Sequence, residues 1–239
     1  MNITTIGIDA DDTLWHNETI FRLTQSRFAE LLAPWAEPDH LTERLAATEA
    51  RNLRLYGYGV KGFTLSMLET AMELTGGDLP GSVTREILAA GREMLSHPVE
   101  PLAGVEEALH ALAQHWRLVL ITKGDLFDQE NKLARSGLGE LFHGVEIVSE
   151  KTAATYRAVF ERHGQGPGRA AMIGNSVRSD ILPALEAGAW AAYIPYEITW
   201  AHEVAEPPVD HPRFQHLSAI GQVHDWLIMA DRLMAEGAA

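Results

Sequence analysis

Carboxylate and ammonium side chains stand in this sequence at positions that suit group transfer at a metal-assisted site. Asp9 and Asp11 lie two residues apart directly after an apolar run, and Lys151 and Asp180 follow later apolar runs. One carboxylate of such a pair can attack an electrophile while the other moves protons. Carboxylate oxygens also bind hard divalent cations. Asp9 and Asp11 are therefore the first candidates for a reaction centre.

Five short apolar runs are predicted to be the strands that position these side chains. They lie at residues 3–8, 118–121, 145–148, 170–173 and 190–194. Helical patterns at residues 128–136, 152–163 and 177–187 separate the last four runs, a helix at 104–115 precedes the second run, and a last helix spans 217–235. Buried parallel strands that alternate with helices are typical of an α/β fold with a doubly wound parallel sheet.

Polar side chains follow the first four of these strands. Because ligands of a parallel α/β sheet bind beyond the carboxyl ends of its strands, we expect these side chains to converge. The first strand is followed by Asp9 and Asp11, and the second by Thr122 and Lys123. The later two strands contribute Lys151, Asn175 and Asp180. Together they form an acidic, hydroxyl and cationic set at one edge of the predicted sheet.

The interval from residue 17 to residue 101 interrupts the alternation of strands and helices. It contains helical patterns only, at residues 19–33, 41–55, 64–74 and 83–96, with prolines between them. We therefore predict a core domain of residues 1–16 and 102–239, with an inserted all-helical domain of residues 17–101. A glycine-rich turn in the insertion carries the side chains Tyr56, Tyr58, Lys61 and Phe63, which either line a substrate pocket or pack on the helices. The same two interpretations apply to Trp200 and His202.

The composition restricts the possible partners and the compartment. The 239 residues are 46% hydrophobic and 22% charged, which is typical of a folded globular protein. The formal net charge is -14 and no basic cluster interrupts it, so we expect no nucleic-acid partner. We also expect no membrane partner, since no apolar run reaches spanning length. The absence of a signal sequence and of cysteine leads us to expect a cytoplasmic protein. The sequence does not indicate the oligomeric state.

The four polar segments resemble the ordered motifs of the haloacid dehalogenase (HAD) superfamily, whose members are mostly phosphatases. Residues 8–14 match the first motif, in which two aspartates and a threonine alternate with variable residues. This motif is the most specific of the four, and the order of the other three motifs strengthens the resemblance. The resemblance covers the whole chain. It implies a HAD-like Rossmannoid core with an inserted helical cap.

The resemblance also implies roles for single residues. Asp9 would be the nucleophile that forms an aspartyl-phosphate. Asp11 would protonate the leaving oxygen and then deprotonate the hydrolytic water. Thr122 and Lys151 would bind the phosphoryl oxygens. Lys123 would either help to hold the phosphate or be a solvated lysine.

Magnesium is the cofactor that the resemblance implies. Its ligands would be the Asp9 carboxylate, the main-chain carbonyl of Asp11 and an oxygen from the fourth motif. Many relatives have an aspartate where this chain has Asn175. The third ligand is therefore either the amide oxygen of Asn175 or the carboxylate of Asp180.

From these features we expect a magnesium-dependent phosphohydrolase that acts on a small phosphate monoester. A 2-haloacid dehalogenase is the first alternative, although Asp11 argues against it because such relatives lack the second aspartate. A phosphonate hydrolase would need a Schiff-base lysine, and Lys61 is the only lysine of the insertion. A phosphomutase would use the same core residues. A catalytically silent binding protein would need a broken motif, of which Asn175 is the one sign.

Overall fold

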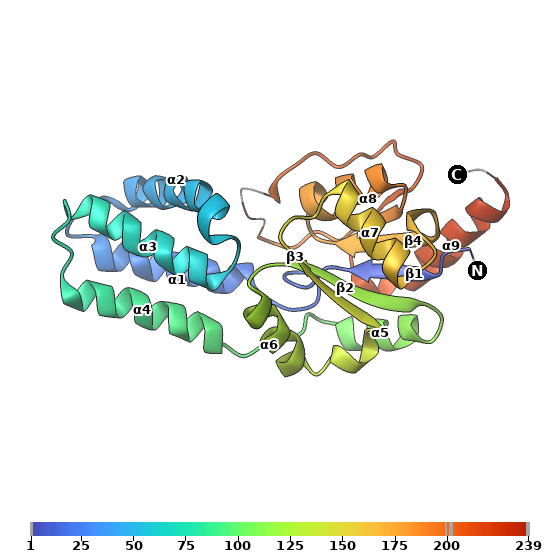
Figure 1. Ribbon diagram of the computed structural model, residues 1–239, viewed down its shortest axis with the longest axis horizontal. Coiled ribbons are helices and arrows are strands. Elements are labelled where there is room, and N and C mark those ends of the chain that lie inside the picture. The colour runs from blue at the N-terminus through green and yellow to red at the C-terminus, as the bar shows by residue number, and fades with distance from the viewer. Residues whose placement is uncertain (1, 199, 201–202, 238–239) are drawn as a thin grey trace. The chain divides into compact units, whose positions relative to one another are not determined.

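A computed structural model describes residues 2–198, 200 and 203–237. The chain forms two compact units. One consists of Met1–Glu18, Val99–Lys123 and Asn131–Ala239, and the other of Thr19–Pro98 and Gly124–Glu130. The first unit contains the strands of the sheet with their covering helices, and the second is all-helical (Figure 1). We refer to them as the α/β unit and the helical unit.

The α/β unit is built on a six-stranded sheet with the order β3-β2-β1-β4-β5-β6. All its neighbouring strands are parallel, which confirms the predicted doubly wound fold. The bounds are β1 (Thr5–Ile8), β2 (Arg117–Lys123), β3 (Gly144–Val148), β4 (Ala170–Gly174), β5 (Trp190–Tyr193) and β6 (Phe214–His216). The last strand was not predicted, because its three residues are too few to show an apolar period. The strand order reverses direction between β1 and β4, which is where ligands bind in such sheets.

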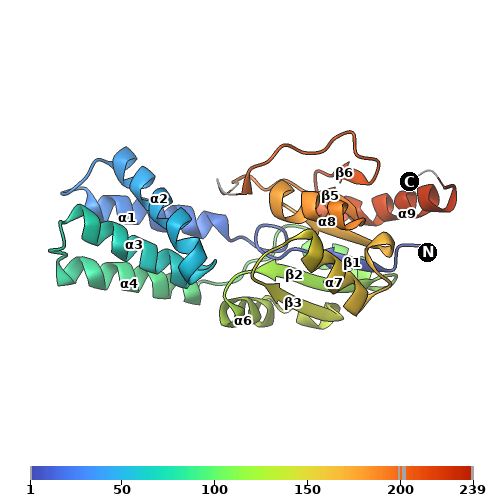
Figure 2. The ribbon, with the colours of Figure 1, turned by 45° about the horizontal axis from the view of Figure 1, so that its top comes forward.

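Helices cover both faces of this sheet (Figure 2). On one face lie α5 (Val105–Ala113), the second half of α6 (Leu126–Ser136) and α9 (Val223–Ala235), whose buried apolar side chains pack on those of β1, β2 and β4. On the other face lie α7 (Ala153–His163) and α8 (Leu182–Ala187). Every residue of β1 is buried, as expected of a central strand. Its carboxyl end is therefore fixed by packing on both sides.

The segment after β4 differs from the single helix predicted at residues 177–187. It begins as a short π-helical segment, Val177–Ile181, and continues as α8. The main-chain N–H groups of Asp180 and Ile181 both donate to the carbonyl of Ser176. Such π-turns are frequent at functional sites, and this one lies in the fourth motif.

The helical unit contains α1 (Glu18–Leu32), α2 (Pro38–Tyr56), α3 (Val60–Leu74) and α4 (Gly81–Ser96), close to the four predicted helices. Its core includes Phe28, Leu41, Phe63 and Met67. The side chain of Phe63 is buried and its ring lies 5.1 Å from that of Phe21, so this aromatic residue of the glycine-rich turn packs on helices.

The other side chains of that turn make polar contacts. The Tyr56 hydroxyl donates to Glu69, and Lys61 forms an ion pair of 2.8 Å with Asp125. His202 lies outside the described residues. Across the described part of the chain, no helix combines the length and the apolar character needed to cross a membrane.

Candidate active site

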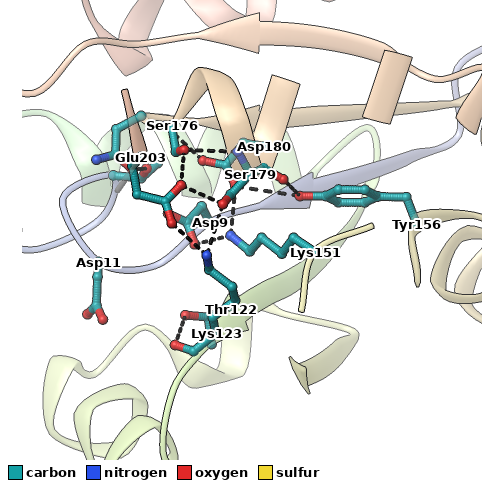
Figure 3. A network of polar contacts seen from close by, with 12 residues as sticks. Asp9, Asp11, Thr122, Lys123, Lys151, Tyr156, Ser176, Ser179, Asp180 and Glu203 are labelled. Carbon is teal, nitrogen blue, oxygen red and sulfur yellow. Dashed lines mark hydrogen bonds and ion pairs between the residues drawn. The ribbon is translucent and has the colours of Figure 1, made fainter. Parts of the chain in front are cut away.

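Asp9 directly follows β1, beside the carboxyl end of β4. Its main-chain N–H donates to the carbonyl of Ile173 at 2.9 Å, which fixes it beyond the end of β1. Lys151 Nζ donates to Asp9 Oδ1 at 2.5 Å and to Asp180 Oδ1 at 2.7 Å (Figure 3). The side chains of Lys151 and Asp180 are 2% and 0% exposed. Three of the predicted site residues therefore form one buried ion-pair cluster.

The charges in this cluster influence one another strongly. Burial and the nearby Asp180 carboxylate raise the pKa of Asp9 to about 7, against the opposing effect of Lys151. Burial alone would lower the pKa of Lys151, but Asp180 and Asp9 hold it above its usual value. Lys151 therefore keeps its positive charge between the two carboxylates. An additional cation near Asp9 would favour the ionised form of that carboxylate.

The Asp180 carboxylate is held by protein donors on both oxygens. Besides the bond from Lys151 to Oδ1, the main-chain N–H of Ser176 donates to Oδ2 at 2.9 Å. The Tyr156 hydroxyl donates to the Ser179 carbonyl at 2.9 Å, which fixes the same turn from the other side. A side chain at Gly174 would collide with the Asp180 carboxylate. Asp180 is thus packed against the backbone of its own motif.

Asn175 places its amide among oxygen atoms. One terminal atom of that amide lies 3.1 Å from Asp9 Oδ2, 3.2 Å from Thr13 Oγ1 and 3.3 Å from the Asp11 carbonyl oxygen. If this atom is the nitrogen, it donates to these oxygens. If it is the oxygen, a cation is needed to hold the set together, because the carboxylate and the carbonyl are acceptors only.

This donor set fits magnesium. It offers a carboxylate oxygen, a main-chain carbonyl and an amide oxygen, all of which are hard ligands. Within the described part of the chain, no group of three or more His, Cys, Asp or Glu side chains could hold a metal ion. A metal site here would therefore depend on the Asn175 amide and the Asp11 carbonyl as well as on Asp9.

The Asp11 side chain lies apart from the Lys151 cluster (Figure 3). Its Oδ1 accepts hydrogen bonds from Trp15 Nε1 at 2.8 Å and from Lys132 Nζ at 3.0 Å. Lys132 also donates to Asn17 Oδ1 at 2.8 Å. The sequence did not identify Lys132, since it belongs to no motif and reaches Asp11 only through the position of α6.

Asp12 stabilises the loop that connects Asp9 and Asp11 to α1. It has a φ of 60°, in the left-handed region that aspartate tolerates better than most residues. Its Oδ1 accepts from the main-chain N–H groups of Asn17 at 2.8 Å and Glu18 at 3.0 Å. Asp12 therefore caps the start of α1 and fixes the turn that carries Asp11.

The second motif contributes one buried hydroxyl and one lysine. The side chain of Thr122 is almost fully buried, and its hydroxyl donates to the Lys123 carbonyl at 3.3 Å. Lys123 Nζ donates to Ser179 Oγ at 2.9 Å and to Glu203 Oε1 at 2.6 Å. Lys123 is therefore not simply solvated, because its ammonium contacts the fourth motif and a carboxylate from the segment after β5.

Glu203 is a site residue that the sequence did not reveal. Burial raises its pKa, but the Lys123 charge and the hydrogen bonds from Lys123, Ser176 and Ser179 outweigh this effect and hold the pKa below its usual value. It lies 80 residues from Lys123 in the sequence. No periodic pattern surrounds it, so no signal in the sequence could have linked the two.

Comparison with known proteins places this chain in a family. The model of the haloacid dehalogenase-like hydrolases matches residues 3–188. A haloacid dehalogenase-like family hydrolase from Xanthomonas campestris is 40% identical, with 99% of this chain and 95% of that chain covered and a TM-score of 0.88. No curated protein matches the chain significantly.

Two further solved structures share the fold at low identity. A HAD hydrolase from Bacillus subtilis bound to magnesium is 16% identical, with a TM-score of 0.66 and coverage of 94% of this chain and 98% of that chain. L-2-haloacid dehalogenase from Xanthobacter autotrophicus, with chloropropionic acid covalently bound, is 15% identical, with a TM-score of 0.65 and the same coverage. The match of the family model and the Xanthomonas similarity agree with the motif order and the sheet, and the chain belongs to the haloacid dehalogenase-like hydrolases.

Proposed function

We propose that the protein is a magnesium-dependent phosphohydrolase that cleaves small phosphate monoesters through an aspartyl-phosphate on Asp9. One observation carries this proposal. The Asn175 amide faces both Asp9 Oδ2 and the Asp11 carbonyl, while Lys151 holds Asp9 Oδ1. With the amide oxygen of Asn175 turned to this position, Asp9 Oδ2 would face the proposed cation site, while Asp9 Oδ1 lies beside the positive charge of Lys151.

In the first step, Asp9 Oδ1 attacks phosphorus and the bond to the leaving oxygen breaks. Asp11 donates a proton to that oxygen, which requires its side chain to turn away from Trp15 and Lys132. In the second step, Asp11 takes a proton from the water that hydrolyses the aspartyl-phosphate. Lys151 and Thr122 stabilise the charge on the phosphoryl oxygens.

Magnesium would neutralise charge on the phosphoryl group and on Asp9. We assign its protein ligands as Asp9, the Asp11 carbonyl and the Asn175 amide oxygen. Asp180 is the weaker candidate because Lys151 and the Ser176 N–H already occupy its oxygens. Its role would be to orient Lys151 and the loop of Asn175.

We also propose that residues 17–101 act as the cap of a core made of residues 1–16 and 102–239. In this role the helical insertion would select the leaving group. Lys61 Nζ is engaged by Asp125 within the helical unit, which disfavours a phosphonate-cleaving role for this lysine.

The test is release of inorganic phosphate from a panel of small phosphate esters, with and without magnesium. Asp9→Asn should lower kcat by about a thousandfold or more while the protein stays folded, because it removes the attacking charge. Asp225→Asn is the matched control, since the Asp225 side chain is 96% exposed. Undiminished turnover by Asp9→Asn would overturn the nucleophile assignment.

The same samples should be tested for halide release from a 2-haloacid. Metal-independent halide release without phosphate release would identify a dehalogenase instead. Transfer of phosphate within a sugar phosphate without release would identify a mutase.

A further inference from the structure

Glu203 occupies a small polar site formed by the second and fourth motifs. Its Oε1 accepts from Lys123 Nζ, and its Oε2 accepts from the hydroxyls of Ser176 and Ser179. Figure 3 shows these three side chains directed at the Glu203 carboxylate. The donors come from the end of β2 and from the turn after β4, whereas the acceptor comes from the segment that follows β5.

The direction of these hydrogen bonds is determined by the number of hydrogens. Ser176 Oγ accepts from the main-chain N–H of Ser179, and Ser179 Oγ accepts from Lys123 Nζ. Each hydroxyl has one hydrogen, and both hydrogens are directed to Glu203. One cation and two hydroxyls therefore converge on a position that only an acceptor can fill. The site is built for an anion, and the two oxygens of a carboxylate match its donors.

The occupant of this site can be exchanged without burying a new charge. The side chains of Lys123 and Glu203 are 12% and 15% exposed, so the pair lies near the surface. Val204 is 63% exposed and Glu206 is also exposed, so the chain next to Glu203 borders solvent. If another carboxylate replaced Glu203, Lys123 would keep a partner and Glu203 would gain water.

The site is adjacent to the proposed reaction centre. Lys123 directly follows Thr122, and Ser179 directly precedes Asp180. Through Asp180 and Lys151, the same turn is connected to Asp9. A ligand with its phosphoryl group at Asp9 could therefore place a second anionic group at Lys123.

We propose that Lys123, Ser176 and Ser179 form a second anion subsite, which Glu203 fills in this structure and which a carboxylate of the substrate takes over on binding. This inference rests on the proposed function and narrows it. The substrate class is a phosphate monoester that also carries a carboxylate. Glu203 is then a specificity-determining residue, because only a substrate that replaces its carboxylate engages Lys123.

The subsite itself can be tested without any enzymatic assay. Acetate, a minimal carboxylate, should raise the melting temperature of Glu203→Ala in a saturable way, since it binds the folded state at the emptied subsite. It should have no such effect on wild type, where Glu203 competes, or on Glu206→Ala, the exposed control on the same segment. If Glu203→Ala is folded and ignores acetate, the subsite is overturned. Glu203→Ser, which also empties the subsite and keeps a polar side chain on the segment, replaces Glu203→Ala if the latter does not fold.

A pair of matched substrates tests the link to specificity. Phosphoglycolate carries a carboxylate, and ethyl phosphate has the same two-carbon chain with a methyl group in place of the carboxylate. Glu203→Ala should lower KM for phosphoglycolate by about tenfold and leave KM for ethyl phosphate unchanged, because it removes only the internal competitor. Equal changes for both esters would contradict the proposal and indicate a structural role for Glu203 or a phosphoryl-binding role for Lys123.

The two proposals fail separately. Acetate binding by Glu203→Ala without hydrolysis of any ester would support the subsite and overturn the phosphohydrolase assignment. Ester hydrolysis by the wild type, with no response of Glu203→Ala to acetate, would support the phosphohydrolase assignment and overturn the subsite.

Discussion

The two units of the protein use ion pairs in opposite ways. In the α/β unit, Lys151 lies between Asp9 and Asp180, and its side chain is 2% exposed. In the helical unit, Arg27 also lies between two carboxylates, Glu86 and Glu93, but its side chain is 46% exposed. The geometry of the two clusters is similar, and the surroundings differ.

Burial determines what each cluster contributes. Water screens the Arg27 cluster, and such exposed pairs contribute about 0–1 kcal/mol. The charges of the Lys151 cluster are shielded from water, so each is stabilised mainly by its ion-pair partner. Removing one partner of such a buried pair lowers the free energy of unfolding by about 3–5 kcal/mol. At the proposed reaction centre, burial of the charges would keep Lys151 positioned beside Asp9. The exposed ion pairs of the helical unit contribute at most small increments to stability.

The largest expected effect is the loss of Lys151. Lys151→Met should lower the free energy of unfolding by about 3–5 kcal/mol near neutral pH, because it leaves two buried carboxylates without their cation. Arg27→Met is the matched control, since it also removes a cation between two carboxylates, and it should cost at most about 1 kcal/mol. Urea unfolding of both variants makes the comparison. Equal losses would refute the contrast between the two clusters.

An effect of intermediate size on magnesium affinity is expected for the proposed metal ligands. Asn175→Asp should tighten magnesium binding by about tenfold or more, because it replaces a neutral ligand by a charged one. Asn175→Ala should abolish the magnesium-dependent rise in melting temperature. Asp180→Asn should weaken binding less, as expected of a residue that acts through Lys151. Titration calorimetry with magnesium checks all three variants, and a reversed order would make Asp180 the ligand.

The smallest expected effect lies in the helical unit and depends on pH. Hydrogen bonds from Tyr56 and Asn52 lower the pKa of Glu69 below its usual value of 4.5. A carboxylate with a lowered pKa stabilises the fold above its unfolded-state value, and this contribution is lost as the pH falls through the folded-state pKa. Glu69→Gln should therefore cost about 0.5 kcal/mol near neutral pH and less at acid pH.

Urea unfolding at neutral pH and at several pH values from 4.5 downward measures the loss of this contribution. A cost for Glu69→Gln that is as large in acid as at neutral pH would show that the charge of Glu69 is not the source of the stability.

Much of the fold could be predicted from the sequence, because local patterns encode it. The apolar runs of β1 to β5 and the four helices of the insertion lie within a few residues of their predicted positions. The differences have local causes. The helix predicted at residues 177–187 begins as a π-turn because two N–H groups share the Ser176 carbonyl, and β6 is too short to show a period.

The sequence by itself identified Asp9, Lys151 and Asp180 as candidate site residues, because each follows a strand of recognisable pattern. Only the tertiary structure decided their partners. Lys151 and Asp9 are 142 residues apart, and the parallel order of the sheet brings them together. Lys132, which pairs with Asp11, and the partners of Lys123 likewise come from distant segments. Local periodicity reports which face of an element is buried, whereas the pairing of side chains across the sheet depends on the order of the strands and the path of the loops between them.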